Sequence, residues 1–302
     1  MAVHEQVVAT DDGARLWTTT QGSGRPVVWC HGGPGGTDNL APVAGMIDDL
    51  AQVHRYEQRG CGRSSGGPPY TMARWIADLE NLRRHWGHER WVVAGHSFGA
   101  ALALAYTIEH PQRVEALVYL SCVVRLQGQP DWYEQYQRAR LERIPAAQRE
   151  AFVEWRRRRR EGGHFDPALA AQLRRLSVTT DFGDADVARR MARQQEADLA
   201  ATNQAINRAL GADFQRYFLA PNRPADLRRL ELPVLLVHGE ADPRPLAAVE
   251  ALAAELRRAR LVRLRGVGHI PWWEAPRVLR DTLRAFLAVR SQDLPSGPPS
   301  GS

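Results

Sequence analysis

Ser97 lies at the centre of the pentapeptide Gly95-His96-Ser97-Phe98-Gly99, which matches the pattern Gly-x-Ser-x-Gly. The apolar run "WVVA" precedes it and "FGAALALAYTIEH" continues from it, so it is expected to join a buried strand to a buried helix. In that context the pattern predicts a sharp turn, with glycines leaving room for the chain to bend. The hydroxyl would stand clear of the sheet near the positive end of the helix, where it could act as a nucleophile.

A serine nucleophile needs a base that removes its proton and an acid that orients the base. Asp242 follows the strand-like run "PVLLVHG", and His269 follows the strand-like run "ARLVRLRG", in the chain order serine, acid, histidine. Because the carboxyl ends of parallel strands meet at one edge of a sheet, we expect both side chains near Ser97. Ser97, Asp242 and His269 are therefore the candidate catalytic triad.

Other side chains near the triad allow different interpretations. Glu240, two residues before Asp242, could be the orienting acid instead. His238 belongs to the predicted strand and is interpreted as a packed core residue, and His96 is expected to point elsewhere in the sharp turn. His238, Glu240 and Asp242 have the residue types of a metal site, but their spacing in a loop is weak evidence, and we expect no metal.

The stretch "HGGPGG" at residues 31–36 follows the apolar run "VVWC". A tetrahedral intermediate carries an oxyanion that needs two N–H donors held in place. We expect one donor from the backbone of Phe98 and the other from this loop, because glycine lets an amide reach the substrate without a Cβ in the way. Gly33 is the preferred donor and Gly32 the next; Pro34 has no N–H. The alternative is a purely structural turn.

Strand-like and helix-like segments alternate along the chain and must position these residues. A hairpin is predicted near residues 5–10 and 14–20, then strands at 26–30, 53–57, 91–95, 114–122, 233–239 and 259–266. Helices are predicted at 41–52, 71–86, 98–110, 245–258 and 276–290. This alternation indicates an α/β fold with a mostly parallel, doubly wound sheet.

The alternation stops between residues 123 and 227, which are helical in character. We expect this segment to be an inserted helical cap over one end of the sheet. The core would then comprise residues 1–122 and 228–290. Residues 291–302 are rich in proline, glycine and serine, and we expect a disordered tail there.

All 40 basic residues are arginine, and the formal net charge is +6. Without lysine, the chain can hold neither a P-loop lysine nor a Schiff-base lysine that anchors pyridoxal phosphate, and no cofactor is expected. The run Arg156–Arg160 suggests nucleic-acid binding, but Glu154 and Glu161 flank it. We interpret the run as a solvated helix face and expect no nucleic-acid partner.

The chain has three widely separated cysteines, which do not form a disulfide framework. Its first residues lack the basic start and apolar stretch of a secretory signal. No segment approaches the roughly 18 apolar residues of a membrane span. We therefore expect a cytoplasmic protein without a membrane partner, and no pattern indicates its oligomeric state.

The chain resembles the prolyl iminopeptidase family of α/β-hydrolases in three motifs: "HGGPG" at 31–35, "QRGCGRS" at 58–64 and "GHIPWWE" at 268–274. The resemblance spans about residues 5–290 and implies the α/β-hydrolase fold, a Ser-His-Asp triad and a pocket formed by the helical cap. Family members remove an N-terminal proline and hold its amino group with cap carboxylates. The candidates for that role, none of them fixed by a motif, are Asp181, Asp184, Asp186, Glu196 and Asp198.

Two positions depart from the family pattern. Glu57 stands where the family usually has aspartate, and the serine turn reads Gly-His-Ser-Phe-Gly instead of Gly-Gly-Ser-Trp-Gly, a form frequent in esterases and thioesterases. The catalytic residues survive both changes, whereas peptidase specificity does not follow. The leading hypothesis is a serine hydrolase that releases N-terminal proline from short peptides. The competing hypotheses are an esterase, lactonase or thioesterase acting on a small acyl substrate, or a non-catalytic binding protein with this scaffold.

Overall fold

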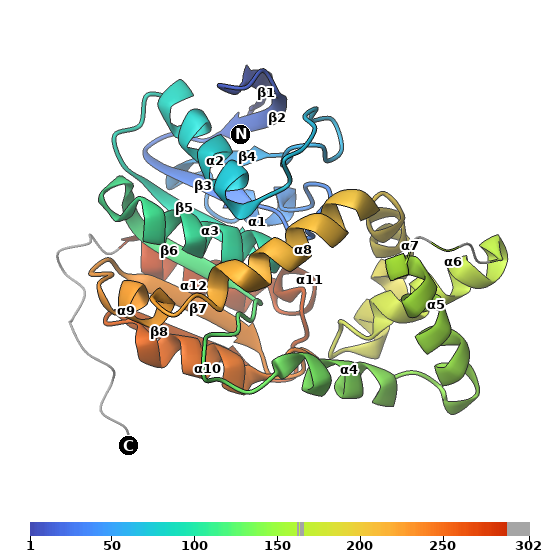
Figure 1. Ribbon diagram of the computed structural model, residues 1–302. Coiled ribbons are helices and arrows are strands. Elements are labelled where there is room, and N and C mark those ends of the chain that lie inside the picture. The colour runs from blue at the N-terminus through green and yellow to red at the C-terminus, as the bar shows by residue number, and fades with distance from the viewer. Residues whose placement is uncertain (162, 164–165, 289–302) are drawn as a thin grey trace.

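Eight strands form one sheet in the computed structural model, which describes residues 1–161, 163 and 166–288. The spatial order is β1-β2-β4-β3-β5-β6-β7-β8 (Figure 1). The strands are β1 (Val3–Ala9), β2 (Arg15–Gln21), β3 (Arg25–Cys30), β4 (Ala51–Tyr56), β5 (Trp91–His96), β6 (Val114–Leu120), β7 (Val234–Gly239) and β8 (Ala259–Leu264). The two pairings of β2 are antiparallel and all others are parallel, which confirms the predicted fold class.

Helices cover both faces of this sheet and extend beyond it. They are α1 (Ala41–Ala44), α2 (Met72–His85), α3 (Phe98–Glu109), α4 (Trp132–Glu142), α5 (Arg149–Glu161), α6 (Pro167–Thr179), α7 (Ala185–Ala200), α8 (Gln204–Phe218), α9 (Arg223–Arg228), α10 (Leu246–Glu255), α11 (Pro271–Glu274) and α12 (Pro276–Ala288). Buried residues of α2, α3 and α10 join one core cluster, and those of α1 and α12 join the other. The sheet is therefore a middle layer between two helical layers.

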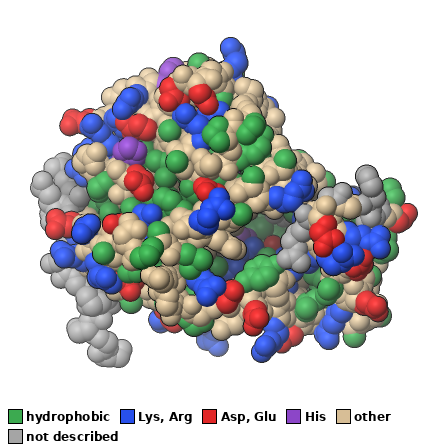
Figure 2. Space-filling view, viewed as in Figure 1, with side chains coloured by type: hydrophobic (Ala, Val, Ile, Leu, Met, Phe, Trp, Pro, Cys, Tyr) green, Lys and Arg blue, Asp and Glu red, His purple; other side chains and the backbone are tan. Residues whose placement is uncertain are grey.

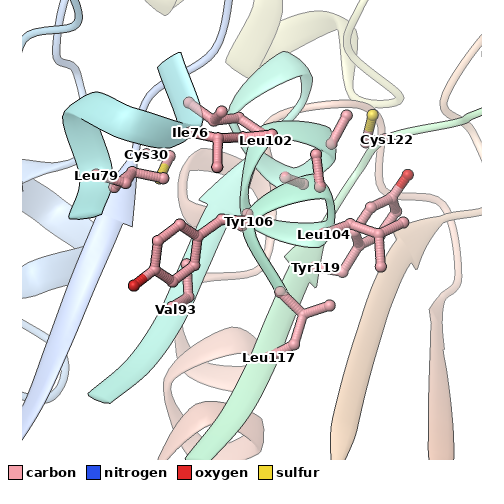
Figure 3. Close-up of a cluster of buried hydrophobic side chains, with 14 of the residues drawn as sticks. Cys30, Ile76, Leu79, Val93, Leu102, Leu104, Tyr106, Leu117, Tyr119 and Cys122 are labelled. Carbon is pink, nitrogen blue, oxygen red and sulfur yellow. The ribbon is translucent and has the colours of Figure 1, made fainter. Parts of the chain in front are cut away.

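Alternate residues of each central strand supply the two cores, as the two-residue period of a strand requires. In β5, Val93 faces α2 and α3, whereas Val92 and Ala94 face the opposite layer. Figure 3 shows Val93 and Leu117 beneath the helices of the first layer. Because both faces are buried, the central strands carry nearly continuous apolar runs.

The predicted helix over residues 41–52 is wrong beyond its first turn. The helix α1 ends at Ala44, and residues 45–50 form turns. Ala51 and Gln52 already belong to β4, where they pair with Arg25 and Pro26 of β3. Pairing with a neighbouring strand has overridden the local helical pattern.

The described residues between β6 and β7 form helices and loops without a strand. Helices α4, α5, α6 and α7 form a lobe beside the sheet, and α8 crosses from this lobe to the core (Figure 1). Ile206, Leu210 and Phe218 of α8 are buried in the same core cluster as α2 and α3. The predicted tail at 291–302 lies outside the described residues. Within the described part of the chain, no helix combines the length and apolar character needed to cross a membrane.

Candidate active site

Ser97 occupies the turn between β5 and α3. Its backbone has φ 54° and ψ −130°, in a region that few residues other than glycine adopt. A Cβ at Gly95 would lie 2.2 Å from the carbonyl oxygen of Gly99, and a Cβ at Gly99 would lie 2.1 Å from that of Cys30. Both positions therefore require glycine. Backbone strain at a single polar residue is typical of functional sites.

His269 and Asp242 lie just beyond β8 and β7, and both side chains are buried. Nδ1 of His269 lies 2.7 Å from Oδ2 of Asp242. Burial alone would raise the pKa of the Asp242 carboxyl, but His269 and Arg244 hold that pKa well below its usual value. An ionised carboxylate only accepts hydrogen bonds, so Nδ1 carries the hydrogen, and Nε2 of the neutral ring is the proton acceptor.

Ser97 and His269 both line a cavity of about 280 Å³ at the carboxyl edge of the sheet. Figure 2 shows the hollow between the main body and the helical lobe, with histidine atoms inside it. Gly32, Gly33 and Gly36 line the same cavity. In the described structure no hydrogen bond joins Oγ of Ser97 to His269. Such catalytic bonds often tighten only when substrate binds.

The glycine loop approaches the serine turn closely. A Cβ at Gly32 would lie 3.3 Å from the Cβ of Ser97, and one at Gly33 would lie 2.7 Å from the amide nitrogen of Gly36. Gly33 also has φ +146°, which a side chain rarely tolerates. Phe98 begins α3, and the first amides of a helix have no partner within it. Gly32 thus lies against the serine turn, Gly33 lines the same cavity as Ser97, and Phe98 follows Ser97 directly.

Gln58 of the motif "QRGCGRS" supports the glycine loop through two hydrogen bonds to His31. Its backbone amide donates to Nε2 of His31 at 2.9 Å, and its side-chain amide donates to the His31 carbonyl at 2.7 Å. On the other side, Nδ2 of Asn207 in α8 donates to the carbonyl of Pro34 at 2.8 Å. The motif therefore supports the loop, a role that the sequence did not reveal.

Glu57, which stands where the family usually has aspartate, forms its ion pair with a nearby residue. The Glu57 carboxylate pairs with Arg63, with 3.0 Å between Oε1 and Nη2. The Arg63 guanidinium in turn lies 3.1 Å above the ring of Trp17. This departure from the family pattern leaves Ser97 and His269 untouched.

Among the described hydrogen bonds His96 makes none to the Ser97 hydroxyl, but its ring lies close to the imidazole of His269. Its buried ring lies 4.6 Å from the rings of both His269 and Trp272, and it lines the cavity. Nε2 of His96 lies 2.8 Å from the carbonyl oxygen of His269, and burial next to that ring holds the pKa of His96 well below its usual value. The neutral ring therefore donates to the backbone of His269. Packing against a distant loop sets this orientation.

Glu240 and His238 lie apart from the contact between the acid and the imidazole. Glu240 is exposed, and Asp242 is the carboxylate that contacts the His269 ring. His238 is buried in β7, with Nε2 at 2.9 Å from the carbonyl of Arg244. No group of three His, Cys, Asp or Glu side chains with the arrangement of a metal site occurs among the described residues.

Two of the five acidic candidates, Asp181 and Asp198, line the cavity. Burial opposes ionisation of Asp181, but Arg244 holds its pKa below the usual value, whereas burial raises the pKa of Asp198. The other three carboxylates bind elsewhere: Asp184 caps α7, Asp186 pairs with Arg189, and Glu196 pairs with Arg174 and Arg175.

Three arginines on the cavity wall were not singled out from the sequence: Arg140, Arg159 and Arg244. Arg159 belongs to the run interpreted as a solvated helix face. That interpretation holds for Arg157 and Arg158, which pair with Glu154 on the outer side of α5, and is wrong for Arg159. Helical periodicity turns one residue of a charged run inward, and only the packing of α5 shows which one.

Glu274, the last residue of the motif "GHIPWWE", joins the loop of His269 to the start of α7. One carboxylate oxygen accepts hydrogen bonds from the amides of Gly183 and Asp184, at 2.7 and 2.8 Å, and the other from Gly268 at 2.8 Å. Burial raises the pKa of Glu274 despite these three donors. The amide of His269 also donates to the Asp181 carbonyl at 2.6 Å. The helical lobe therefore helps to position the imidazole.

Glu274→Gln is expected to lower kcat/KM by about 10- to 100-fold, because an amide has one acceptor oxygen for three donors and the His269 loop shifts. The free energy of unfolding should fall by about 1–3 kcal/mol. Steady-state kinetics and urea unfolding measure the two effects. The exposed substitution Asp281→Asn is the control. A kcat/KM equal to that of the control would show that Glu274 does not position the site.

Comparisons with known proteins show which family has a matching sequence pattern. A family model described as alpha/beta hydrolase fold matches residues 25–276. The proline iminopeptidase of Xylella fastidiosa (strain Temecula1) is 36% identical over 140 residues, which cover 45% of this chain and 45% of that protein. The chain spans less than half of the length of the curated relatives it matches.

Solved structures share the fold at low sequence identity. A thermophilic esterase from Thermogutta terrifontis has a TM-score of 0.72 at 22% identity, covering 94% of this chain and 98% of the esterase. A proline iminopeptidase of Mycobacterium smegmatis has a TM-score of 0.69 at 20% identity, covering 94% and 98% of the two chains. The folds of an esterase and of a proline iminopeptidase thus match the fold of this chain about equally well.

Proposed function

Since the chain belongs to the alpha/beta hydrolase fold family, we propose that it is a serine hydrolase whose triad is Ser97, His269 and Asp242. The observation that carries this proposal is the contact between the buried Asp242 and His269 beside a serine held in a strained turn at the start of a helix. The three side chains come from the ends of three parallel strands, where such sheets place their ligands.

In the first half-reaction, Nε2 of His269 takes the proton of Ser97 as Oγ attacks the substrate carbonyl carbon. The amides of Phe98 and Gly33 donate to the oxyanion of the tetrahedral intermediate. When the intermediate collapses, the leaving group departs with the proton from His269, and an acyl-enzyme remains on Ser97. Water then attacks the acyl carbon, giving its proton to His269, which returns it to Ser97 as the acid leaves.

Two substrate classes fit this chemistry. Release of N-terminal proline is supported by the curated relatives that are proline iminopeptidases, and Asp181 and Asp198 are carboxylates on the cavity wall that could face its amino group. Hydrolysis of a small ester is supported by the arginines on the same wall, since positive charge disfavours a protonated amine. The cavity volume suits a small acyl group in either case.

A comparison of two chromogenic substrates with the purified chain distinguishes these classes. Turnover of proline p-nitroanilide would support the peptidase reaction, and turnover of p-nitrophenyl butyrate alone would support the esterase reaction. A fluorophosphonate probe should label the wild-type chain in both cases, because it reacts with an activated serine. If the chain neither reacts with the probe nor turns over either substrate, it is a binding protein and the proposal is wrong.

A further inference from the structure

Two guanidinium groups on the cavity wall have no carboxylate partner among the described residues. They belong to Arg140 of α4 and Arg159 of α5, which line the same cavity as Ser97. The third arginine, Arg244, differs because Asp181 and Asp242 lie 3.0 and 2.9 Å from its Nη1. The cavity wall thus contains one guanidinium that forms ion pairs with carboxylates and two that form no such pair within the described part of the chain.

The Arg140 side chain is buried, and its donors go to neutral oxygen atoms. Nε donates to the Thr180 hydroxyl at 2.8 Å, Nη1 to the Tyr136 hydroxyl at 2.8 Å, and Nη2 to the Ser177 carbonyl and hydroxyl at 2.7 and 2.6 Å. These bonds fix the guanidinium plane without cancelling its charge. Asp181, whose pKa Arg140 also lowers, offsets part of this charge, and a further anion would stabilise the buried cation more.

Arg159 is partly buried, with its guanidinium carbon 5.6 Å from the ring of Trp155. Burial and the nearby charges of Arg140, Arg156 and Arg174 lower its pKa to about 10, so it remains charged at neutral pH. Arg140, Arg156 and Arg174 are therefore close enough to Arg159 to add positive charge on this side of the cavity.

We propose that Arg140 and Arg159 form a carboxylate-binding subsite, so that the acyl group transferred to Ser97 carries a carboxylate. The substrate class is then the half-esters of small dicarboxylic acids. Arg159 can pair with a carboxylate through two parallel hydrogen bonds, whereas Arg140, whose Nε and Nη2 donors are engaged, contributes mainly its charge. The inference rests on the proposed serine hydrolase function and specifies its substrate.

The test compares mono-p-nitrophenyl glutarate, whose distal carboxylate is free, with its neutral methyl ester. The wild-type chain is expected to prefer the half-ester by about 10-fold or more in kcat/KM, as charge-assisted hydrogen bonds allow. Arg159→Gln should remove this preference by lowering kcat/KM for the half-ester about 10-fold or more. Arg157→Gln, on the exposed side of α5, is the matched control and should keep the preference.

A wild-type ratio near one, an unchanged ratio in Arg159→Gln, or faster turnover of proline p-nitroanilide than of the half-ester would overturn the proposal. Binding is measured separately by the thermal midpoint in the presence of glutarate. Glutarate should stabilise the wild type and the Arg157→Gln control but not Arg159→Gln. If it does so while neither ester is cleaved, the subsite stands and the hydrolase function fails; without this stabilisation, the subsite is wrong.

Discussion

Ser97→Ala is expected to lower kcat by about 10⁴- to 10⁶-fold, to the level left by substrate binding and the oxyanion donors. The reason is that the methyl side chain cannot form the acyl-enzyme, while the turn, the glycine loop and the His269–Asp242 contact keep their places. The measurement is turnover of the best substrate of the panel, together with labelling by the fluorophosphonate probe, which should disappear.

The thermal midpoint of this variant is the control for folding and should stay close to that of the wild type. Removing one hydroxyl beside the cavity leaves the core clusters intact, and surface changes of this size usually alter stability little. A variant that folds normally and retains more than about one hundredth of wild-type kcat would contradict the assignment of Ser97 as nucleophile.

Asp242→Asn is expected to reduce kcat by about 10⁴-fold. The amide can donate a hydrogen bond to Nδ1 of His269, which favours the ring tautomer whose Nε2 carries a hydrogen and cannot accept the serine proton. The loss should persist across neutral pH, since the charges around Asp242 keep its pKa well below its usual value and the wild-type carboxylate stays ionised there. The pH profile of kcat/KM for both proteins measures this difference.

Glu240→Gln is the matched control, because Glu240 lies two residues away and is exposed. It should change kcat by less than about twofold, as most exposed substitutions away from a site do. If both variants lost activity equally, the contact at 2.7 Å between Asp242 and His269 would not define the orienting acid.

Local sequence patterns predicted much of the fold. Continuous apolar runs in β5 and β7 identified buried strands, and the resulting parallel sheet was confirmed. Glycines at strand ends pointed to the turn that holds Ser97 and to the glycine loop, because these turns need backbone conformations that glycine adopts most readily. The error at residues 45–52 arose where pairing with β3 decided the conformation, which no local pattern records.

The arginine-lined side of the cavity could not be predicted in the same way. Arg140 and Arg159 lie on helices whose charged residues look alike in sequence, and only the packing of α4 and α5 turns these two inward. The contacts of His96 were not predicted for the same reason, since its partners His269 and Trp272 are more than 170 positions away in the chain. Contacts between residues far apart in the chain leave no periodic pattern in the sequence from which they could be predicted.

The hydrogen bonds that tie residues 181–184 to the loop of His269 have an evolutionary consequence. A mutation that reshapes the cavity near Asp181 is expected also to move the backbone that carries His269, the proposed general base. New specificities are therefore expected to arise more easily at Arg159 of α5, which lines the cavity, than on α4, where Arg140 bonds Thr180 next to this connection. Directed evolution of the chain should diversify α5 and hold residues 181–184 constant.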